Sequence, residues 1–187
     1  MLERSDEKLV SQYLKGDEKS LEILIKRYLK PIYSFVYRYI GNAQDAEDIT
    51  QDTFIKAWRH LKRFKPQKKF KTWIFTIAKN TAIDFLKKKK DIPFSQFENE
   101  EGENIITETL ADTSPLPSEP LEHQDVSRIL SEAMGKLSPK YRTVLFLRYN
   151  DHFTFREIAE VLSEPLHTVK SRHRRTLIQL KKLLPKP

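Results

Sequence analysis

Apolar residues recur every three or four positions through most of this chain, which is the spacing of side chains on one face of an α-helix. Before residue 91 this pattern predicts four helices. Ser5 is placed to cap the first helix, and Gly16 and Gly41 are placed to end the first and the second. Serine caps helix starts, and glycine adopts the left-handed backbone that ends helices. The third helix is expected over about residues 44–61 and the fourth over about residues 72–89.

After residue 125 the same spacing predicts a second group of helices. Ser138 followed by Pro139 is typical of a helix start, with a capping hydroxyl and a proline in the first turn. Thr154 and Glu157 have the spacing of a capping box. The helix that they open ends before Pro165, and a last helix follows to about residue 184. Two helices separated by so short a break, the second rich in cations, predict a helix-turn-helix.

The composition favours an all-α fold. Only four of the 187 residues are glycine, and helix-favouring Leu, Lys, Glu and Arg are abundant. Cysteine is absent and the five histidines form no ligand cluster, so we expect no disulfide, no metal and no cofactor. Residues 1–15 lack the apolar run of a signal peptide, and no stretch approaches the roughly 20 apolar residues of a membrane span. We therefore expect a cytoplasmic protein without direct membrane insertion.

Charge divides the chain into three parts. The formal net charge of +8 predicts a polyanionic partner, either nucleic acid or an anionic membrane surface. Residues 91–125 hold ten Asp and Glu, no Lys or Arg, and four prolines, a composition typical of a linker that packs no core. The other residues carry 34 basic and 16 acidic side chains, a balance of +18. We predict two small basic helical domains, residues 1–90 and 126–187, joined by an acidic flexible linker over residues 91–125.

The last helix carries the clearest candidate chemistry. Its apolar face is expected to hold Val169, His173, Leu177, Leu180 and Leu184. A neighbouring face then presents Lys170, Ser171, Arg174 and Arg175. A helix fits the major groove of DNA, where Arg and Lys meet guanine edges and phosphates. The alternative is a solvated basic surface helix, and the capped partner helix before the short break favours the DNA-binding interpretation.

A second candidate site lies between the third and fourth predicted helices. Residues 64–73 interleave aromatic and cationic side chains, and Asn80 follows on the next helix. Lysines that track phosphates beside an apolar pocket suit an unpaired strand, and an amide can read the pairing edge of an extruded base. The helix ends in four lysines, residues 87–90, which suit the adjoining duplex backbone. Alternatively, Trp73 and Phe75 belong to the core and the lysines are a solvated helix end.

A third candidate is acidic. Asp45, Asp48 and Asp52 fall on one face of the third predicted helix, with Glu47 and Gln51 beside them. Carboxylates in a first helical turn stabilise the helix dipole, but three on one face of a basic domain also suit a basic protein partner. The spacing alone leaves these alternatives open.

Several motifs together resemble the extracytoplasmic-function (ECF) family of RNA polymerase sigma factors, within the sigma-70 superfamily. The N-terminal part carries AEDITQDTF at residues 46–54, KTWIFTIAKN at 71–80 and DFLK at 84–87. The C-terminal part carries LSPKYRTV at 137–144, EIAEVL at 157–162 and TVKSR at 168–172. The resemblance covers nearly the whole chain outside the acidic segment, with the motifs in the family's order.

The resemblance implies a sigma2-like helical bundle, a sigma4-like helix-turn-helix and a set of site residues. Contacts with the double-stranded −35 element are implied for Lys170, Ser171, Arg172, Arg174 and Arg175. Contacts with the single-stranded −10 element are implied for Phe64, Lys65, Lys68, Lys69, Phe70, Lys71, Asn80, Lys87 and Lys88. Docking on the polymerase core is implied for Asp48, Gln51, Asp52, Phe54 and Trp58.

The implied function is that of an alternative sigma initiation factor, which catalyses nothing itself. Its implied partners are promoter DNA and core polymerase, contacted at the clamp helices of the largest subunit and at the flap region. Many members are also held by a membrane-anchored anti-sigma factor. The chain departs from the usual family residues at Thr76, His167, His173 and Thr176, which bears on the promoter sequence and not on the class.

Two other functions remain as alternatives on the residues alone. A stand-alone helix-turn-helix regulator explains the C-terminal part but leaves the N-terminal constellations unexplained. A helical adaptor for acidic proteins or membranes predicts that the Lys170–Arg175 cluster is dispensable. An enzyme lacks support, because the sequence has no glycine-rich phosphate loop and no hydrolase-type serine motif.

Overall fold

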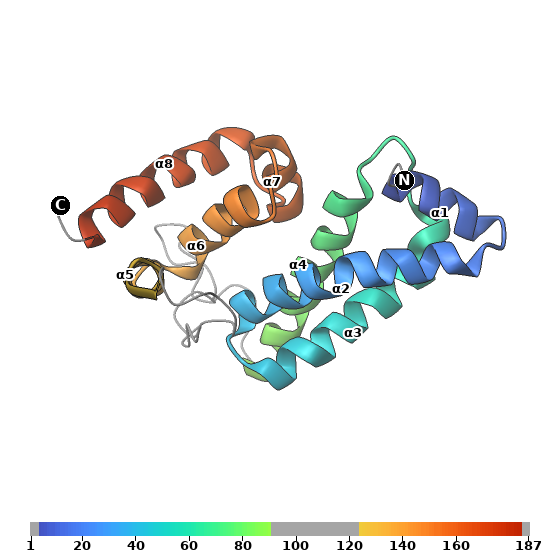
Figure 1. Cartoon of the computed structure of the whole chain (residues 1–187), viewed down its shortest axis with the longest axis horizontal. Helices are drawn as coiled ribbons and strands as arrows, with labels where there is room; N and C mark the ends of the chain where they lie inside the picture. The colour runs from blue at the N-terminus through green and yellow to red at the C-terminus, as the bar shows by residue number, and fades with distance from the viewer. Residues whose placement is uncertain (1–3, 91–123, 185–187) are drawn as a thin grey trace. The chain divides into compact units, whose positions relative to one another are not determined.

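The computed structural model describes residues 4–90 and 124–184, and every regular element in these ranges is helical (Figure 1). The expected all-α fold is therefore confirmed for this part of the chain. The elements are α1 (Asp6–Leu14), α2 (Glu18–Ile40), α3 (Ala43–His60), η1 (Leu61–Arg63), α4 (Phe70–Lys90), α5 (Gln124–Gly135), α6 (Pro139–Leu145), η5 (Phe146–Asn150), α7 (Phe155–Leu162) and α8 (Leu166–Leu183).

The described residues form two compact units. The first contains α1 to α4, and the second contains α5, α6, η5, most of α7, and α8. The predicted acidic linker, residues 91–125, lies outside the described residues except for Gln124 and Asp125, with which α5 begins.

In the first unit α2 and α3 lie antiparallel, and α4 packs against both (Figure 1). The apolar faces predicted from the sequence meet in its core, where the fully buried side chains include Leu24, Ile32, Val36, Ile49, Ala57, Ile74 and Phe75. The predicted caps are confirmed: the Ser5 hydroxyl accepts a bond from the Lys8 N–H, and Gly41 has a left-handed φ of 80°. Helix α2 continues through Pro31 without ending.

Helix α4 begins at Phe70, two residues before the predicted start. The residue before it, Lys69, has no side-chain acceptor with which to cap a helix. The missing acceptor comes from a different helix, because Oε1 of Glu7 on α1 lies 3.1 Å from the backbone nitrogen of Phe70. Sequence spacing within one segment contains no information on a cap supplied 63 residues away.

In the second unit the capping box that opens α7 is confirmed. The Thr154 N–H donates to Oε2 of Glu157 at 2.7 Å, and the Glu157 N–H donates to Oγ1 of Thr154 at 3.3 Å. Helix α6 begins at Pro139 as predicted, but the Ser138 hydroxyl makes no capping bond. A π-helical turn, η5, then leads into the loop before α7.

The predicted face of α8 is confirmed in part, because Val169 is buried and His173, Leu180 and Leu184 are half-buried. Val169 is fully buried, but the other buried residues are Arg172 and Thr176, whereas Leu177 is 41% exposed. Thr176 is tolerated inside because its hydroxyl donates to the Arg172 carbonyl at 2.8 Å. Arg172 lies inside together with an ion-pair partner, Glu164, described below.

Candidate nucleic-acid interface

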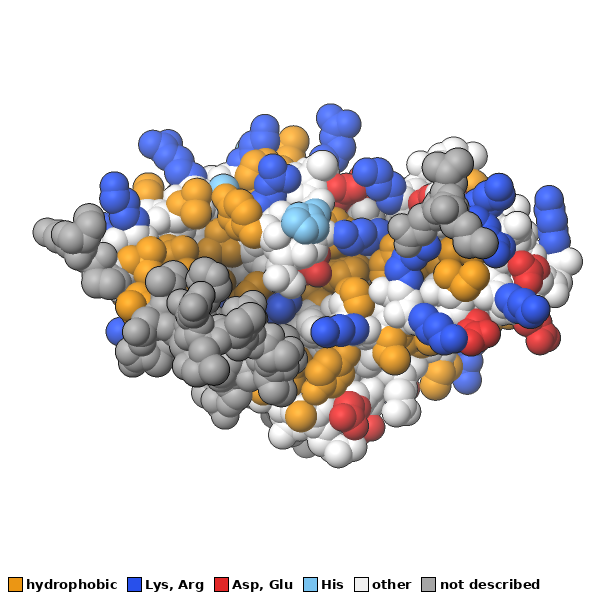
Figure 2. All heavy atoms as spheres, viewed as in Figure 1, with side chains coloured by type: hydrophobic (Ala, Val, Ile, Leu, Met, Phe, Trp, Pro, Cys, Tyr) orange, Lys and Arg blue, Asp and Glu red, His pale blue; other side chains and the backbone are white. Residues whose placement is uncertain are grey.

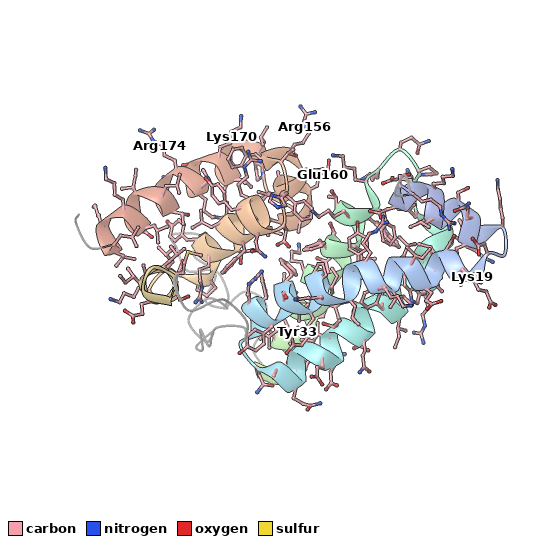
Figure 3. All side chains as sticks on the ribbon, in the orientation of Figure 1. Lys19, Tyr33, Arg156, Glu160, Lys170 and Arg174 are labelled. Carbon is pink, nitrogen blue, oxygen red and sulfur yellow. The ribbon has the colours of Figure 1, made fainter. Side chains whose placement is uncertain are left out.

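The exposed side of α8 is a row of polar and basic side chains. Lys170, Ser171, Arg174 and Arg175 are all exposed, as the sequence predicted. Figure 3 shows Lys170 and Arg174 projecting away from the rest of the second unit, with Arg156 of α7 projecting in the same direction. Blue Lys and Arg side chains follow this edge in Figure 2. Arg156 is not among the site residues predicted from the sequence.

Arg172 does not belong to this exposed row. It is 8% exposed, and its guanidinium pairs with Glu164 at 2.8 Å, in the turn between α7 and α8. The same turn contains Ser163 with a left-handed φ of 58°. The implied DNA contact by Arg172 is therefore corrected, because its side chain is used to hold the turn.

His173 lies in an aromatic cluster beside the exposed row. Its Nε2 is 3.0 Å from the Tyr149 hydroxyl, and its ring meets the Phe155 ring edge-on at 4.9 Å. The Arg148 guanidinium lies 5.0 Å from the centre of the same Phe155 ring. Burial, and secondarily the charge of Arg148, lower the pKa of His173 below its ordinary value. The side chain packs α8 against η5 and the first residue of α7.

Between α3 and α4, the aromatic and cationic side chains separate. Phe70 is 0% exposed and Phe64 is also buried, and each ring contacts the half-buried Trp73 at a centroid distance of 5.6 and 5.3 Å respectively. The implied base contacts by Phe64 and Phe70 are corrected, since both rings belong to the core. Trp73 is the member of this cluster with exposed ring surface.

The lysines of the same segment lie outside. Lys65, Lys68 and Lys69 are exposed, and a turn closed by the Lys68 N–H and the Lys65 carbonyl, 2.9 Å apart, presents them. On α4, Asn80 and Lys88 are exposed, and Lys71 and Lys87 are partly exposed. Asn80 stands seven residues after Trp73 and seven before Lys87, the spacing of one helix face.

The outer face of α3 is acidic and partly apolar. Asp48, Gln51 and Asp52 are exposed, and so is Ile55, at 46%. Phe54 is buried against Trp58, which is half-buried, at a ring-centroid distance of 5.8 Å. The implied docking contact by Phe54 is corrected, because it faces the core. Ile55 was missed, although its position seven residues after Asp48 places it on the same face.

Neither a metal site nor a membrane span is found in the part of the chain that the structure describes. Within residues 4–90 and 124–184, no group of His, Asp and Glu could hold a metal ion. Among the helices of these ranges, none has the length and apolar character needed to cross a membrane.

Comparison with known proteins gives concordant matches. The family model for sigma-70 region 2 matches residues 24–92, and that for sigma-70 region 4 matches residues 127–180. The ECF RNA polymerase sigma factor SigW of Bacillus subtilis is 35% identical over 185 residues, covering 98% of each chain. The ECF RNA polymerase sigma-E factor of Escherichia coli K12 is 31% identical, covering 90% of this chain and 88% of its own.

Solved structures agree on the fold. The sigma factor RpoE of Bartonella quintana, in complex with the anti-sigma factor NepR, matches with a TM-score of 0.65 and 25% identity, covering 88% of this chain and 96% of its own. CnrH, in complex with the cytosolic domain of CnrY, matches with a TM-score of 0.64 and 22% identity over 96% and 97% of the two chains.

Proposed function

This chain belongs to the ECF family of RNA polymerase sigma factors, and on that premise we propose which of its surfaces select and open a promoter. Sigma factors are initiation factors without catalytic activity of their own, so the chain acts by directing RNA polymerase to promoter DNA.

We propose that residues 126–187 read the −35 element as duplex DNA. The observation that carries this assignment is the exposed row of Lys170, Ser171, Arg174 and Arg175 on α8, behind a turn held by the Arg172–Glu164 ion pair. A rigid turn keeps α8 at a fixed angle, as a helix that enters the major groove requires. Arg156, which projects in the same direction, is added as a phosphate contact.

We propose that residues 1–90 bind the −10 element and the polymerase. The exposed Lys65, Lys68 and Lys69 neutralise phosphates of the unpaired strand, while Asn80 reads a base. Lys71, Lys87 and Lys88 extend this cationic surface along α4. The docking surface for the largest-subunit clamp helices is the outer face of α3, formed by Asp48, Gln51, Asp52, Ile55 and Trp58.

We also propose where this chain acts and what restrains it. The chain works in the cytoplasm, where RNA polymerase is. Because the similar RpoE is found bound to an anti-sigma factor, we propose that this chain too is restrained by such a partner. The predicted linker, residues 91–125, joins the −10-binding and −35-binding domains.

The test is run-off transcription with purified core polymerase on a library of promoters with randomised −35 and −10 elements. We expect the wild-type chain to start transcription from a defined subset of the library, and the double variant Arg174→Ala/Arg175→Ala to lose −35 preference. Lys181→Ala/Lys182→Ala, an equal loss of exposed charge at the end of α8, is the matched control and should keep the preference. Tight binding of a dimer to duplex DNA without polymerase, and no effect on initiation, would support the stand-alone regulator instead.

A further inference from the structure

Helix α1 is anchored firmly on α2. The Asp6 carboxylate accepts hydrogen bonds from the Arg27 guanidinium and from the Tyr28 hydroxyl, and Leu9 and Val10 are buried. Burial, and secondarily the bond to Asp6, raise the pKa of Tyr28, so its hydroxyl stays protonated and remains a donor. The position of the residue after Asp6 is thereby fixed relative to the bundle.

That next residue, Glu7, reaches the start of α4. Its Oε1 lies 3.1 Å from the backbone nitrogen of Phe70, the first residue of that helix. The first N–H groups of a helix have no partner within the helix, and a carboxylate there also meets the positive end of the helix dipole. Since Lys69 offers no side-chain acceptor, Glu7 replaces the cap that the local sequence lacks.

The segment that Glu7 fixes is the lysine loop, residues 65–69. Its flanking residues, Phe64 and Phe70, are buried and in ring contact at a centroid distance of 5.7 Å. The Phe70 ring also contacts Tyr28, the same residue that anchors α1, at 5.3 Å. The loop therefore leaves and rejoins the bundle at one aromatic cluster, and its rejoining end is bonded to α1.

We propose that Glu7 is a positioning residue for the lysine loop, holding the first turn of α4 so that Lys65, Lys68 and Lys69 are presented to the unpaired −10 strand. This inference rests on the proposed function for its DNA partner. Without Glu7 the Phe70 N–H loses its acceptor and the helix start moves toward residue 72, where the sequence alone places it. The lysine loop then becomes longer at its C-terminal end, and its lysine side chains are held in less defined positions.

The first experiment measures amide hydrogen exchange at Phe70 in the full-length chain. In Glu7→Ala the exchange should accelerate by roughly five- to thirtyfold, the effect of losing a helix cap. Glu7→Gln keeps an acceptor oxygen at the same reach and should restore most of the protection. Glu18→Ala, which removes an exposed carboxylate from the first turn of α2, is the matched control and should leave Phe70 unchanged. Unchanged exchange at Phe70 in Glu7→Ala would overturn the inference.

The second experiment uses holoenzyme assembled with core polymerase and a promoter selected by the wild-type protein. Binding of an oligonucleotide carrying its single-stranded −10 sequence should weaken by about three- to tenfold in Glu7→Ala, and binding of the −35 duplex should not change. Recovery by Glu7→Gln would assign the effect to the acceptor oxygen at Phe70, since both variants keep the Asp6 anchor. Unchanged −10 binding in Glu7→Ala would contradict the positioning role.

A parallel variant separates this inference from the proposed function. If Lys68→Ala weakens −10 binding while Glu7→Ala does not, the positioning role alone fails. If neither variant weakens −10 binding, the assignment of the lysine loop to DNA fails, and the inference about Glu7 fails with it.

Discussion

Arg172 and Arg174 stand two positions apart on α8 and have opposite surroundings. Arg172 is buried and paired with Glu164, which is 29% exposed, whereas Arg174 is exposed. A buried charge that loses its partner is costly, while an exposed charge contributes little to folding. The two arginines should therefore separate stability from DNA recognition.

Arg172→Ala should lower the free energy of unfolding of the second unit by about 2 kcal/mol, because it leaves the Glu164 carboxylate unpaired. Arg174→Ala should leave stability within about 0.5 kcal/mol but reduce discrimination at the −35 element by roughly 1–3 kcal/mol if it makes a bidentate base contact. Urea unfolding and competition binding with mismatched −35 duplexes measure the two effects. Equal loss of stability in both variants would contradict the assignment of Arg172 to folding and of Arg174 to DNA recognition.

His173 makes stability depend on pH. Its pKa is lower in the folded state than the ordinary 6.5, so the unfolded chain binds the proton more readily. Its contribution to stability is therefore complete above about pH 6.5 and is lost as the pH falls from there through the folded pKa. Amide exchange at Val169, corrected for its intrinsic pH dependence, should report a smaller opening free energy at pH 5.5 than at 7.5.

Two variants assign this pH dependence. His173→Gln keeps a hydrogen-bonding group near Tyr149. In this variant the opening free energy at Val169 should change little between pH 5.5 and 7.5. His167→Gln removes an exposed histidine from the same helix and should retain the pH dependence. If the pH dependence of the opening free energy persists in His173→Gln, a titrating group other than His173 causes it.

At the residue scale, the sequence patterns predicted the exposure of charged side chains better than the exposure of aromatic rings. Lys65, Lys68 and Arg174 are exposed as predicted. Phe64 and Phe70 are buried, not exposed as implied. A loop flanked by aromatic residues can either bury or expose its rings while its lysines face solvent, and the sequence pattern is the same in the two cases. Arg172 was misassigned because its partner Glu164 lies in the turn, outside the helical spacing.

At the scale of elements, α3 divides its two faces between the core and a partner. Asp48, Gln51, Asp52 and Ile55 form the outer face, while Ile49, Thr53 and Phe54 are buried. A central apolar residue among polar ones is typical of an interface whose core excludes water. The proposed polymerase contact therefore depends on the whole face.

Asp48→Arg should abolish association with core polymerase while the helix content and the midpoint of thermal unfolding stay close to those of the wild type. The reason is that an exposed side chain changes sign at a surface proposed to meet a basic partner. Glu22→Arg, the same charge change at an exposed position of α2, is the control. Co-elution of Asp48→Arg with core polymerase at wild-type yield would refute the docking assignment.

Element boundaries could be predicted where the stop or start signal is local. Ser5, Gly41 and the Thr154–Glu157 box each act within four residues, and each is confirmed. The start of α4 could not be predicted, because its cap comes from Glu7 on another helix. The burial of Arg172 on α8 could not be predicted either, since its partner Glu164 lies in the turn before the helix.

At the scale of the whole molecule, the excess of positive charge belongs to the two proposed DNA-binding domains, and residues 91–125 are acidic. The chain carries +8 in total, but its residues outside 91–125 carry +18. Phosphate contacts of this kind make DNA affinity fall steeply with salt. Modest affinity at each of two elements, joined in one polypeptide and held by polymerase, multiplies into selective binding of one promoter.

The two tryptophans of the sequence are Trp58 and Trp73, and both lie in the first unit, half-buried. Trp58 sits on the helix proposed to meet polymerase, and Trp73 sits beside the lysine loop. Ultraviolet light absorbed by indole is therefore re-emitted from these two places and from no others in the chain. Without any added dye, the protein therefore carries an indole fluorophore at each of its two proposed N-terminal contact surfaces, and the part proposed to bind the −35 element carries none.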